Sequence, residues 1–283
     1  MDECVTLVSF SGMNPLTADD ALHLRVLAAE TMVIDRTWAT RDVRSPYWRF
    51  YANDRDGAEL LLGGGRRYAL TSGQVHFVPA WVQFTCRNVE TLAHLYAHVE
   101  LVGIPGAVVR EVFPRPMAVA LDPSLRAGCA RLRAQLADPG LAPAARLCHV
   151  KSVIYEALGR LFAALPPARA QRCLTLRGHS AVVAPALALI EARFNEALSN
   201  PLLAHTCGLS ADHFIRCFRT AVGQTPTQYV LERRLAAQRL LFSTEPIDSI
   251  AADCGFGDRY YFTRAFRQRM GLPPAAFRAR GHI

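Results

Sequence analysis

Arg216 and Arg264 stand 48 residues apart, in equivalent places of a repeated sequence pattern. An arginine side chain ends in a planar fork of N–H donors, and this fork matches the O6 and N7 acceptors on the major-groove edge of guanine. Each arginine lies midway between two phenylalanines spaced four residues apart, so on a helix it points away from their apolar face. The pair is a candidate for reading base edges in double-stranded DNA, provided that two helices hold both side chains outward.

The rest of the repeat indicates which elements would hold them. Residue types recur at an offset of 47 up to the first glycine and 48 after it, and one residue inserted after that glycine in the second copy reconciles the offsets. Chance rarely preserves so many residue types in order, so we interpret the segment as a duplication. The matched pairs include Leu203 and Ile250, Ala204 and Ala251, Gly208 and Gly255, Phe214 and Phe262, Phe218 and Phe266, Gly223 and Gly271, and Pro226 and Pro274.

Each copy is predicted to form a helix, a turn and a second helix. Gly208 ends a short first helix, because glycine adopts left-handed backbone angles at low cost. Ser210 is a suitable N-cap for the next helix, and Asp258 is the corresponding N-cap in the second copy. Apolar residues then recur at helical spacing, which gives each second helix one buried face. The pattern is typical of a helix-turn-helix, present twice.

Between the two copies, residues 229–242 are predicted to form one long helix with an apolar side and an arginine-rich side. A rigid helix would fix the distance between the two units. If both second helices enter successive major grooves on one face of DNA, they must lie about one helical turn apart, ~34 Å.

These motifs together resemble the DNA-binding domain of the AraC/XylS family of bacterial transcription regulators, over about a third of the chain. Where the family usually has a small residue, this chain has Tyr260. The motifs are Gly208-Leu209-Ser210, Phe214-x-Arg216-x-Phe218-Arg219, Gly223-x2-Pro226-x2-Tyr229, Arg234-Leu235-x2-Gln238-x-Leu240-Leu241, and Ile250-Ala251-x3-Gly255-Phe256-x-Asp258-x2-Tyr261-Phe262-x-Arg264-x-Phe266-Arg267-x3-Gly271-x2-Pro274-x2-Phe277-Arg278.

A helix-turn-helix reads bases with the N-terminal part of its second helix. Arg216 and Arg264 match positions where the resemblance implies contact with DNA. The alternative for each is a solvated or phosphate-touching arginine, which would position the protein without specifying sequence. The predicted DNA-binding residues are Asp212, Ile215, Arg216, Arg259, Tyr260, Thr263 and Arg264.

Before residue 121 the sequence favours strands. Short β-favouring runs separated by glycine turns predict strands at 47–51, 58–62, 68–70, 74–78 and 92–101, typical of a β-sandwich or small barrel. Residues 19–30 fit either a short helix or, at 22–26, a first strand. The run from Trp48 to Asn53, with His94-Leu95-Tyr96-x-His98, resembles the cupin-like sensor that precedes the double helix-turn-helix in the family.

Alternation along 92–101 places His94, Tyr96, His98 and Glu100 on one face of a strand. The first three are either half-buried sheet residues or part of a small-molecule pocket. Aromatic faces with a few hydrogen-bonding groups suit a sugar or a similar polar ligand. The predicted ligand-binding residues are Trp48, Tyr51, Trp81, Tyr96 and His98.

The alternative function is that of a cupin-type protein, either a metal-dependent enzyme or a sugar-binding protein. In that case the helical tail would serve only for oligomerisation. His94 and His98 lie roughly 13 Å apart along a strand at ~3.3 Å per residue, too far to share an ion. His98 and Glu100 could share a metal ion, with His76 as a distant third ligand. We predict no catalytic residue, no metal and no cofactor.

The chain is long enough for two cores, and the expected fold class is α+β. We predict a cupin-like sensor domain at 1–121, a helical linker with possible dimerisation helices at 122–180, and a DNA-binding domain at 181–283. The helix-turn-helix units are placed at about 201–222 and 248–271. Within the linker region, Asp138-Pro139-Gly140 should separate two helices, and residues 166–180 are the best domain boundary.

Net charge is +8, and half of it lies in residues 185–283, so bulk charge is consistent with a polyanion partner without locating it. Eight cysteines without a CxxC pair predict free thiols in a reducing cytosol. No signal peptide or membrane span is expected. We therefore predict a cytoplasmic, non-enzymatic regulator whose partners are operator or promoter DNA, a small-molecule effector, a second copy of the chain in a homodimer, and RNA polymerase.

Overall fold

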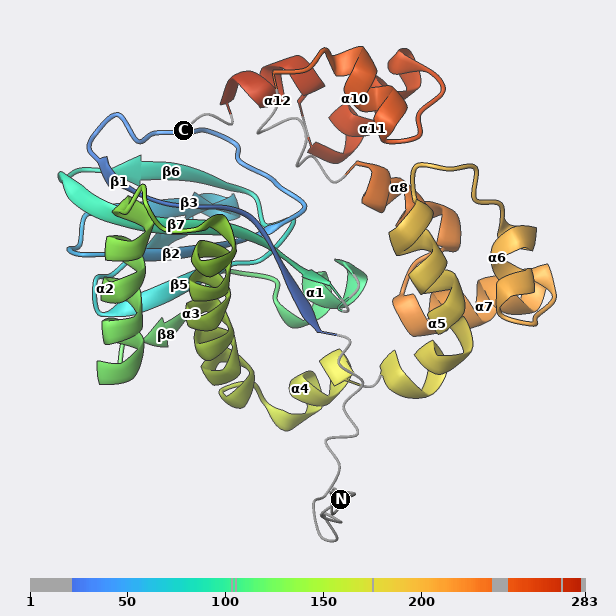
Figure 1. Cartoon of the computed structure of the whole chain (residues 1–283), viewed down its shortest axis with the longest axis horizontal. Coiled ribbons are helices and arrows are strands. Elements are labelled where there is room, and N and C mark those ends of the chain that lie inside the picture. The colour runs from blue at the N-terminus through green and yellow to red at the C-terminus, as the bar shows by residue number, and fades with distance from the viewer. Residues whose placement is uncertain are drawn as a thin grey trace, which may run out of the picture.

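Strands and helices separate along the chain into a β-rich N-terminal part and a helical C-terminal part, as expected for the α+β class (Figure 1). The computed structural model describes residues 22–102, 104, 106–174, 176–235, 244–270 and 272–280. Among these residues no helix combines the length and the apolar character that crossing a bilayer requires.

The N-terminal part consists of two antiparallel sheets, and we refer to it as the β-domain. The larger sheet has the order β1-β7-β2-β5-β8, and the smaller one has the order β4-β3-β6. The strands are β1 (His23–Ile34), β2 (Trp48–Asn53), β3 (Ala58–Leu62), β4 (Arg67–Ala69), β5 (Gln74–Val78), β6 (Phe84–Asn88), β7 (Leu92–Val102) and β8 (Met117–Ala120).

The register between β2 and β7 decides which side chains share the space between the sheets. Arg49 pairs with His98, and Tyr51 pairs with Tyr96. Because strand side chains alternate, Trp48 and Phe50 point to the opposite face of the large sheet, where they join its main hydrophobic core. Polar and aromatic residues therefore line the inner face, and the helices cover the outer one.

Two helices pack on that outer face, α2 (Pro123–Ala137) and α3 (Pro143–Ala163), as Figure 1 shows. The break between them falls at the predicted Asp138-Pro139-Gly140 segment, because proline cannot continue the helix. Asp122 caps α2 by accepting a hydrogen bond from the Leu125 backbone N–H at 2.9 Å, and its other oxygen pairs with Arg160 of α3. This carboxylate ties the two helices together.

The C-terminal part is helical throughout its described residues. Residues 166–180, predicted as a linker, are mostly helical. The helices of the whole chain outside α2 and α3 are α1 (Gly106–Val112), α4 (Pro167–Leu174), α5 (Leu176–Arg193), α6 (Asn200–Thr206), α7 (Ala211–Val222), α8 (Pro226–Arg234), α10 (Ile247–Asp253), α11 (Arg259–Met270) and α12 (Pro274–Arg280).

Some sequence-based predictions need correction. The helical alternative for residues 19–30 is wrong where the structure describes them, because residues 23–34 form strand β1 against β7. Strands β6 and β8 and helix α1 were not predicted. The long connecting helix begins at Pro226, three residues earlier than expected, with Thr225 and Gln228 forming a capping box. The rest of its predicted span, residues 236–242, lies outside the described residues.

The two helix-turn-helix units are packed differently. The first has its own hydrophobic cluster, centred on Phe214 and Phe218. Buried residues of the second, such as Phe262 and Phe266, belong to the same contiguous cluster as the outer core of the β-domain. The second unit is therefore the one docked on the β-domain.

Candidate DNA-binding surface and ligand cavity

The first helix-turn-helix consists of α6 and α7. Gly208 has a φ of 65°, the left-handed conformation predicted for the turn. Ser210 occupies the N-cap position of α7, although its side chain makes no capping hydrogen bond. Phe214 and Phe218 are fully buried, which confirms them as core and leaves the opposite face of α7 to solvent.

The second helix-turn-helix consists of α10 and α11. Asp258 caps α11 as predicted, because its two carboxylate oxygens accept hydrogen bonds from the Tyr260 and Tyr261 backbone N–H groups at 2.9 and 3.0 Å. Gly255 has a φ of 79°, and a Cβ at this position would lie 2.3 Å from the carbonyl oxygen of Asn195. Only glycine fits this turn.

The predicted DNA-reading residues lie at the N-terminal parts of α7 and α11, and most of them are exposed. Arg216 and Arg264 are both exposed on the faces opposite the buried phenylalanines. Tyr260 has 76% of its surface exposed, an unusual position for a large aromatic residue. The others are exposed Asp212 and Arg259, and half-buried Ile215 and Thr263.

Arg259 has a partner within its own unit. Its Nε lies 3.1 Å from the Oδ1 of Asp248 in α10, and both side chains are 59% exposed. A surface ion pair of this kind contributes little to stability. Arg259 can therefore leave Asp248 for a phosphate or a base at a small cost in free energy. Until then, the ion pair holds the Arg259 side chain at the start of α11.

The two ends of α11 have different surroundings. At its C-terminal end, the guanidinium carbon of Arg269 lies 4.6 Å from the ring centroid of Trp81 in the β-domain. Arg269 also forms an ion pair with Glu232 of α8. Met270, the next residue, is buried. The β-domain thus holds the far end of α11 while the end with Tyr260 and Arg264 faces outward.

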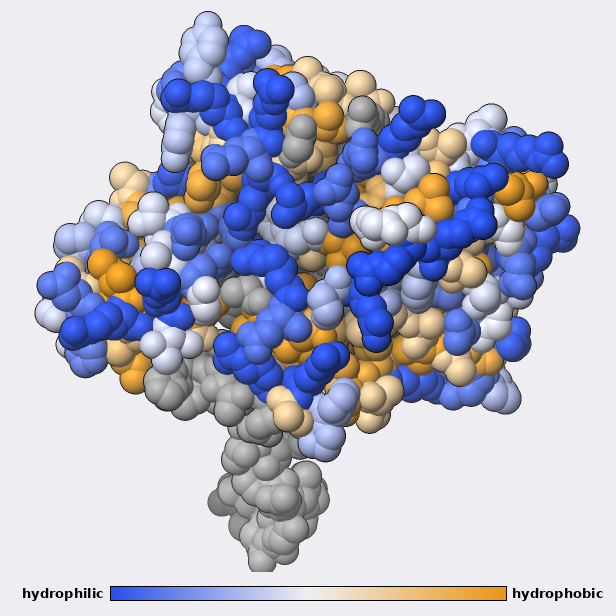
Figure 2. Space-filling view, turned by 180° about the vertical axis from the view of Figure 1, so that it is seen from behind, coloured by the Kyte–Doolittle hydropathy of each residue, from blue (hydrophilic) through white to orange (hydrophobic). Residues whose placement is uncertain are grey.

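The face of the molecule shown in Figure 2 is mainly hydrophilic, with apolar residues in separate small patches. The lobe that carries α10 to α12 projects at the top of this view with hydrophilic side chains over much of its surface. A hydrophilic surface of this kind suits a polar partner more than an apolar one.

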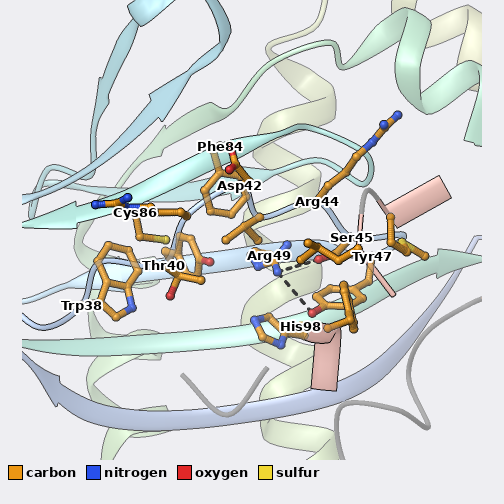
Figure 3. Close-up of a pocket in the computed structure, with 16 residues that line it drawn as sticks. Trp38, Thr40, Asp42, Arg44, Ser45, Tyr47, Arg49, Phe84, Cys86 and His98 are labelled. Carbon is orange, nitrogen blue, oxygen red and sulfur yellow. Dashed lines mark hydrogen bonds between the residues drawn. The ribbon is translucent and has the colours of Figure 1, made fainter. Parts of the chain in front are cut away.

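A cavity of about 70 Å³ lies between the two sheets, at the end where the second helix-turn-helix docks (Figure 3). Tyr51 and His98, two of the predicted ligand-binding residues, line it together with Arg49. His98 packs against Tyr47, with ring centroids 4.8 Å apart and the rings tilted by 38°. Burial, and then the charge of Arg49, holds the pKa of His98 well below its usual range, so this imidazole is neutral at pH 7.

The other three predicted ligand residues lie elsewhere. Trp48 and Trp81 line a second cavity of about 80 Å³ between the β-domain and the helices α5 and α8. Tyr96 is half-buried beside His98 and donates a hydrogen bond to Glu30 at 3.0 Å. The structure therefore does not bring the five residues into one pocket.

Sequence reasoning missed most of the residues that line the first cavity. Arg49 is one: a charged residue inside an aromatic strand was the signal that could have found it. Trp38 and Phe84 line the same space from a loop and from β6. Met270 reaches it from the end of α11 and Phe277 from α12, and no local pattern predicts either contact.

The histidines of the β-domain have protein partners or aromatic neighbours. His94 Nδ1 shares a hydrogen bond of 2.7 Å with Asn53, and burial lowers the pKa of His94 to about 3. His76 lies between Tyr68 and the carbonyl oxygen of Thr71. Across the part of the chain that the structure describes, no three His, Cys, Asp or Glu side chains are grouped closely enough to hold a metal ion.

The arrangement defines a class of protein: two helix-turn-helix units that present arginine-bearing helices beside a β-domain. Residues 203–280 match the helix-turn-helix domain family. The chain is 32% identical over 104 residues to regulatory protein SoxS of Escherichia coli K12. This alignment covers 36% of this chain and 97% of SoxS. It is also 38% identical over 80 residues to the MmsAB operon regulatory protein of Pseudomonas aeruginosa. This second alignment covers 28% of this chain and 26% of that protein.

The whole fold is similar to that of ToxT from Vibrio cholerae, in a crystal structure with bound (E)-4-(8-methylnaphthalen-1-yl)but-3-enoic acid. The TM-score is 0.53 and the identity 9%, over 89% of this chain and 98% of ToxT. This likeness concerns the fold alone. The repeat, the two helix-turn-helix units and the match to nearly all of SoxS place the chain in the AraC/XylS family of transcription regulators.

Proposed function

We propose that this protein binds operator or promoter DNA through both helix-turn-helix units, and that a small molecule bound in the β-domain controls that binding. In this proposal residues 1–121 form the sensor, 122–180 the helical linker, and 181–283 the DNA-binding domain. The observation that carries it is the pair Arg216 and Arg264, which are exposed at equivalent positions of α7 and α11.

Base reading by these arginines follows from their chemistry. Each guanidinium can donate two hydrogen bonds to one guanine, a contact worth about 1–3 kcal/mol of discrimination. Asp212, Ile215, Tyr260 and Thr263 would contact neighbouring bases or phosphates. Arg219 and Arg267, both exposed, would add phosphate contacts that position the helices.

Control by a ligand needs a physical connection between the domains, and the interface supplies one. Trp81 contacts Arg269 of α11, and Arg110 of α1 lies 3.5 Å from Glu232 of α8. A ligand that favours or disfavours this docked arrangement changes how the second helix-turn-helix is presented to DNA.

A homodimer, acting in the cytoplasm and contacting RNA polymerase at the promoter, completes the proposal. Leu147 and Tyr155 of α3 are 42% and 39% exposed and lie eight residues apart on one helix. With Lys151 between them, these two exposed side chains are the contact that the linker helices would offer to a second copy. Light scattering coupled to size-exclusion chromatography tests the dimer. The mass of a monomer at about 50 µM protein would contradict the proposed homodimer.

The DNA-binding proposal is tested by fluorescence anisotropy with the DNA upstream of the protein's own coding region. Arg264→Ala should weaken binding by about 1–3 kcal/mol, about 5- to 150-fold in Kd. The matched control is Arg66→Ala, which removes an exposed arginine from the loop before β4. Equal affinities for the wild type and Arg264→Ala would contradict base reading by Arg264.

A further inference from the structure

The cavity between the sheets contains a buried positive charge. Arg49 is 7% exposed, and its Nη2 donates hydrogen bonds to the Ser45 hydroxyl at 2.8 Å and the Tyr47 hydroxyl at 3.3 Å. Its guanidinium carbon lies 4.7 Å from the ring centroid of Tyr47 and 5.2 Å from that of Phe84. These neighbours are uncharged, and within the described ranges no carboxylate pairs with Arg49.

A guanidinium withdrawn from water without an acidic partner is costly, unless an anion completes the site. The acidic side chain on the cavity lining is Asp42, which is exposed and makes no ion pair with Arg49. Arg44 also belongs to the lining but extends away from Arg49 (Figure 3). The charge balance of the cavity therefore favours an anion.

A second polar group in the same cavity lacks a partner. Nδ1 of His98 is buried and makes no hydrogen bond to any residue that the structure describes. Figure 3 shows His98 on the same side of the cavity as Tyr47, with Arg49 above it. A cation without a counter-ion and an imidazole nitrogen without a partner thus converge on one small space.

Large apolar and aromatic side chains form another part of the wall, and they come from both domains. Trp38, Tyr51 and Phe84 belong to the β-domain, while Met270 ends α11, Phe277 belongs to α12, and Leu272 lies between these two helices. At about 10–15 Å³ for each water molecule, a volume of 70 Å³ holds roughly five to seven waters. A hexose, with about a dozen non-hydrogen atoms, exceeds this volume.

We propose that this cavity binds a small monocarboxylate, whose carboxylate group pairs with Arg49 and hydrogen-bonds to His98, and whose apolar body packs against the aromatic walls. Short-chain acids of about six non-hydrogen atoms match the volume. The ligand contacts Met270 and Phe277 directly, so its binding is coupled to the position of the second helix-turn-helix. This inference rests on the proposed role of the β-domain as a sensor, and it replaces a sugar as the expected ligand.

The test uses the full-length protein and compares acids with their neutral isosteres. Butyrate is titrated by calorimetry and thermal shift against butyramide and arabinose. Butyrate should bind and raise the Tm, while butyramide should bind at least about tenfold more weakly, because an ion-assisted hydrogen bond is lost. Equal binding of acid and amide, or binding of arabinose alone, would overturn the proposal without any variant having to fold.

Substitutions of two arginines on the cavity lining test whether Arg49 binds the carboxylate. Arg49→Gln should lose at least about tenfold in butyrate affinity, Arg49→Lys should retain part of it, and Arg44→Gln, on the same lining, should leave it unchanged. Retained butyrate affinity in a folded Arg49→Gln protein would also overturn the proposal.

A parallel DNA titration separates the failure of this inference from failure of the proposed function. Saturating butyrate should change the Kd for upstream DNA about fivefold or more. DNA binding by a protein that takes up no carboxylate would overturn the ligand assignment and leave the regulator intact. Carboxylate binding by a protein that binds no DNA would support the ligand assignment and remove the regulator.

Discussion

Arg233 of α8 lies 3.6 Å from Glu100 of β7, and this ion pair joins the DNA-binding half of the protein to its β-domain. Arg233 also lies 2.7 Å from Glu191 of α5. Arg25 of β1 reaches the same two carboxylates, at 3.0 Å from Glu100 and 3.9 Å from Glu191. Because Arg233 and Glu100 are 15% and 7% exposed, the network is largely withdrawn from solvent screening.

Glu100→Gln should therefore destabilise the protein by about 3 kcal/mol, because it leaves two cations sharing one remaining carboxylate. Urea unfolding measures the free energy. The control is Glu196→Gln, whose ion pair with Arg193 at 2.8 Å is exposed on both sides and should contribute less than about 1 kcal/mol. Equal losses in the two variants would show that the interdomain network does not hold the domains together.

Gly255→Ala should destabilise the second helix-turn-helix by at least about 2 kcal/mol. Its φ of 79° strains any side chain, and the new Cβ would overlap the Asn195 carbonyl. Gly257→Ala, two residues later, has no atom within 4 Å of the added Cβ and should change stability by less than about 0.5 kcal/mol. Thermal unfolding of both variants checks the pair, and similar Tm values would contradict the turn geometry.

His94 predicts a loss of stability in acid. Burial, and then the charge of Arg133, lowers its folded-state pKa to about 3 from the ordinary 6.5. Between these values the unfolded chain binds a proton that the folded protein does not, so stability falls as the pH falls below 6.5 and levels off below 3. In this window the free energy of unfolding of the wild type should fall by about 1.4 kcal/mol more per pH unit than that of His94→Gln. Urea unfolding at a series of pH values measures both. If the two proteins lose stability in parallel, burial of a neutral His94 is not the cause.

Much of the helical half could be predicted from the sequence, because its signals are local. The left-handed glycines, the Asp258 cap and the buried phenylalanines each act within one turn of their own helix. Duplication then supplied an internal check, since the second copy repeats the first.

The ligand cavity could not be predicted in the same way. Trp48 and Tyr51 are three residues apart on β2, so alternation sends them to opposite faces of the sheet. Arg49 becomes significant only when β6 and the second helix-turn-helix remove it from water. Helix α1, with its run of valines, formed a helix because it packs against the outer core.

The most direct measurement is a hydroxyl-radical footprint of the protein on its upstream DNA. If α7 and α11 enter successive major grooves, protection should appear as two patches on one face of the duplex, about 10 base pairs apart. Arg216→Ala should weaken one patch and Arg264→Ala the other. A single patch, or two patches that neither variant alters, would contradict the account of two reading helices.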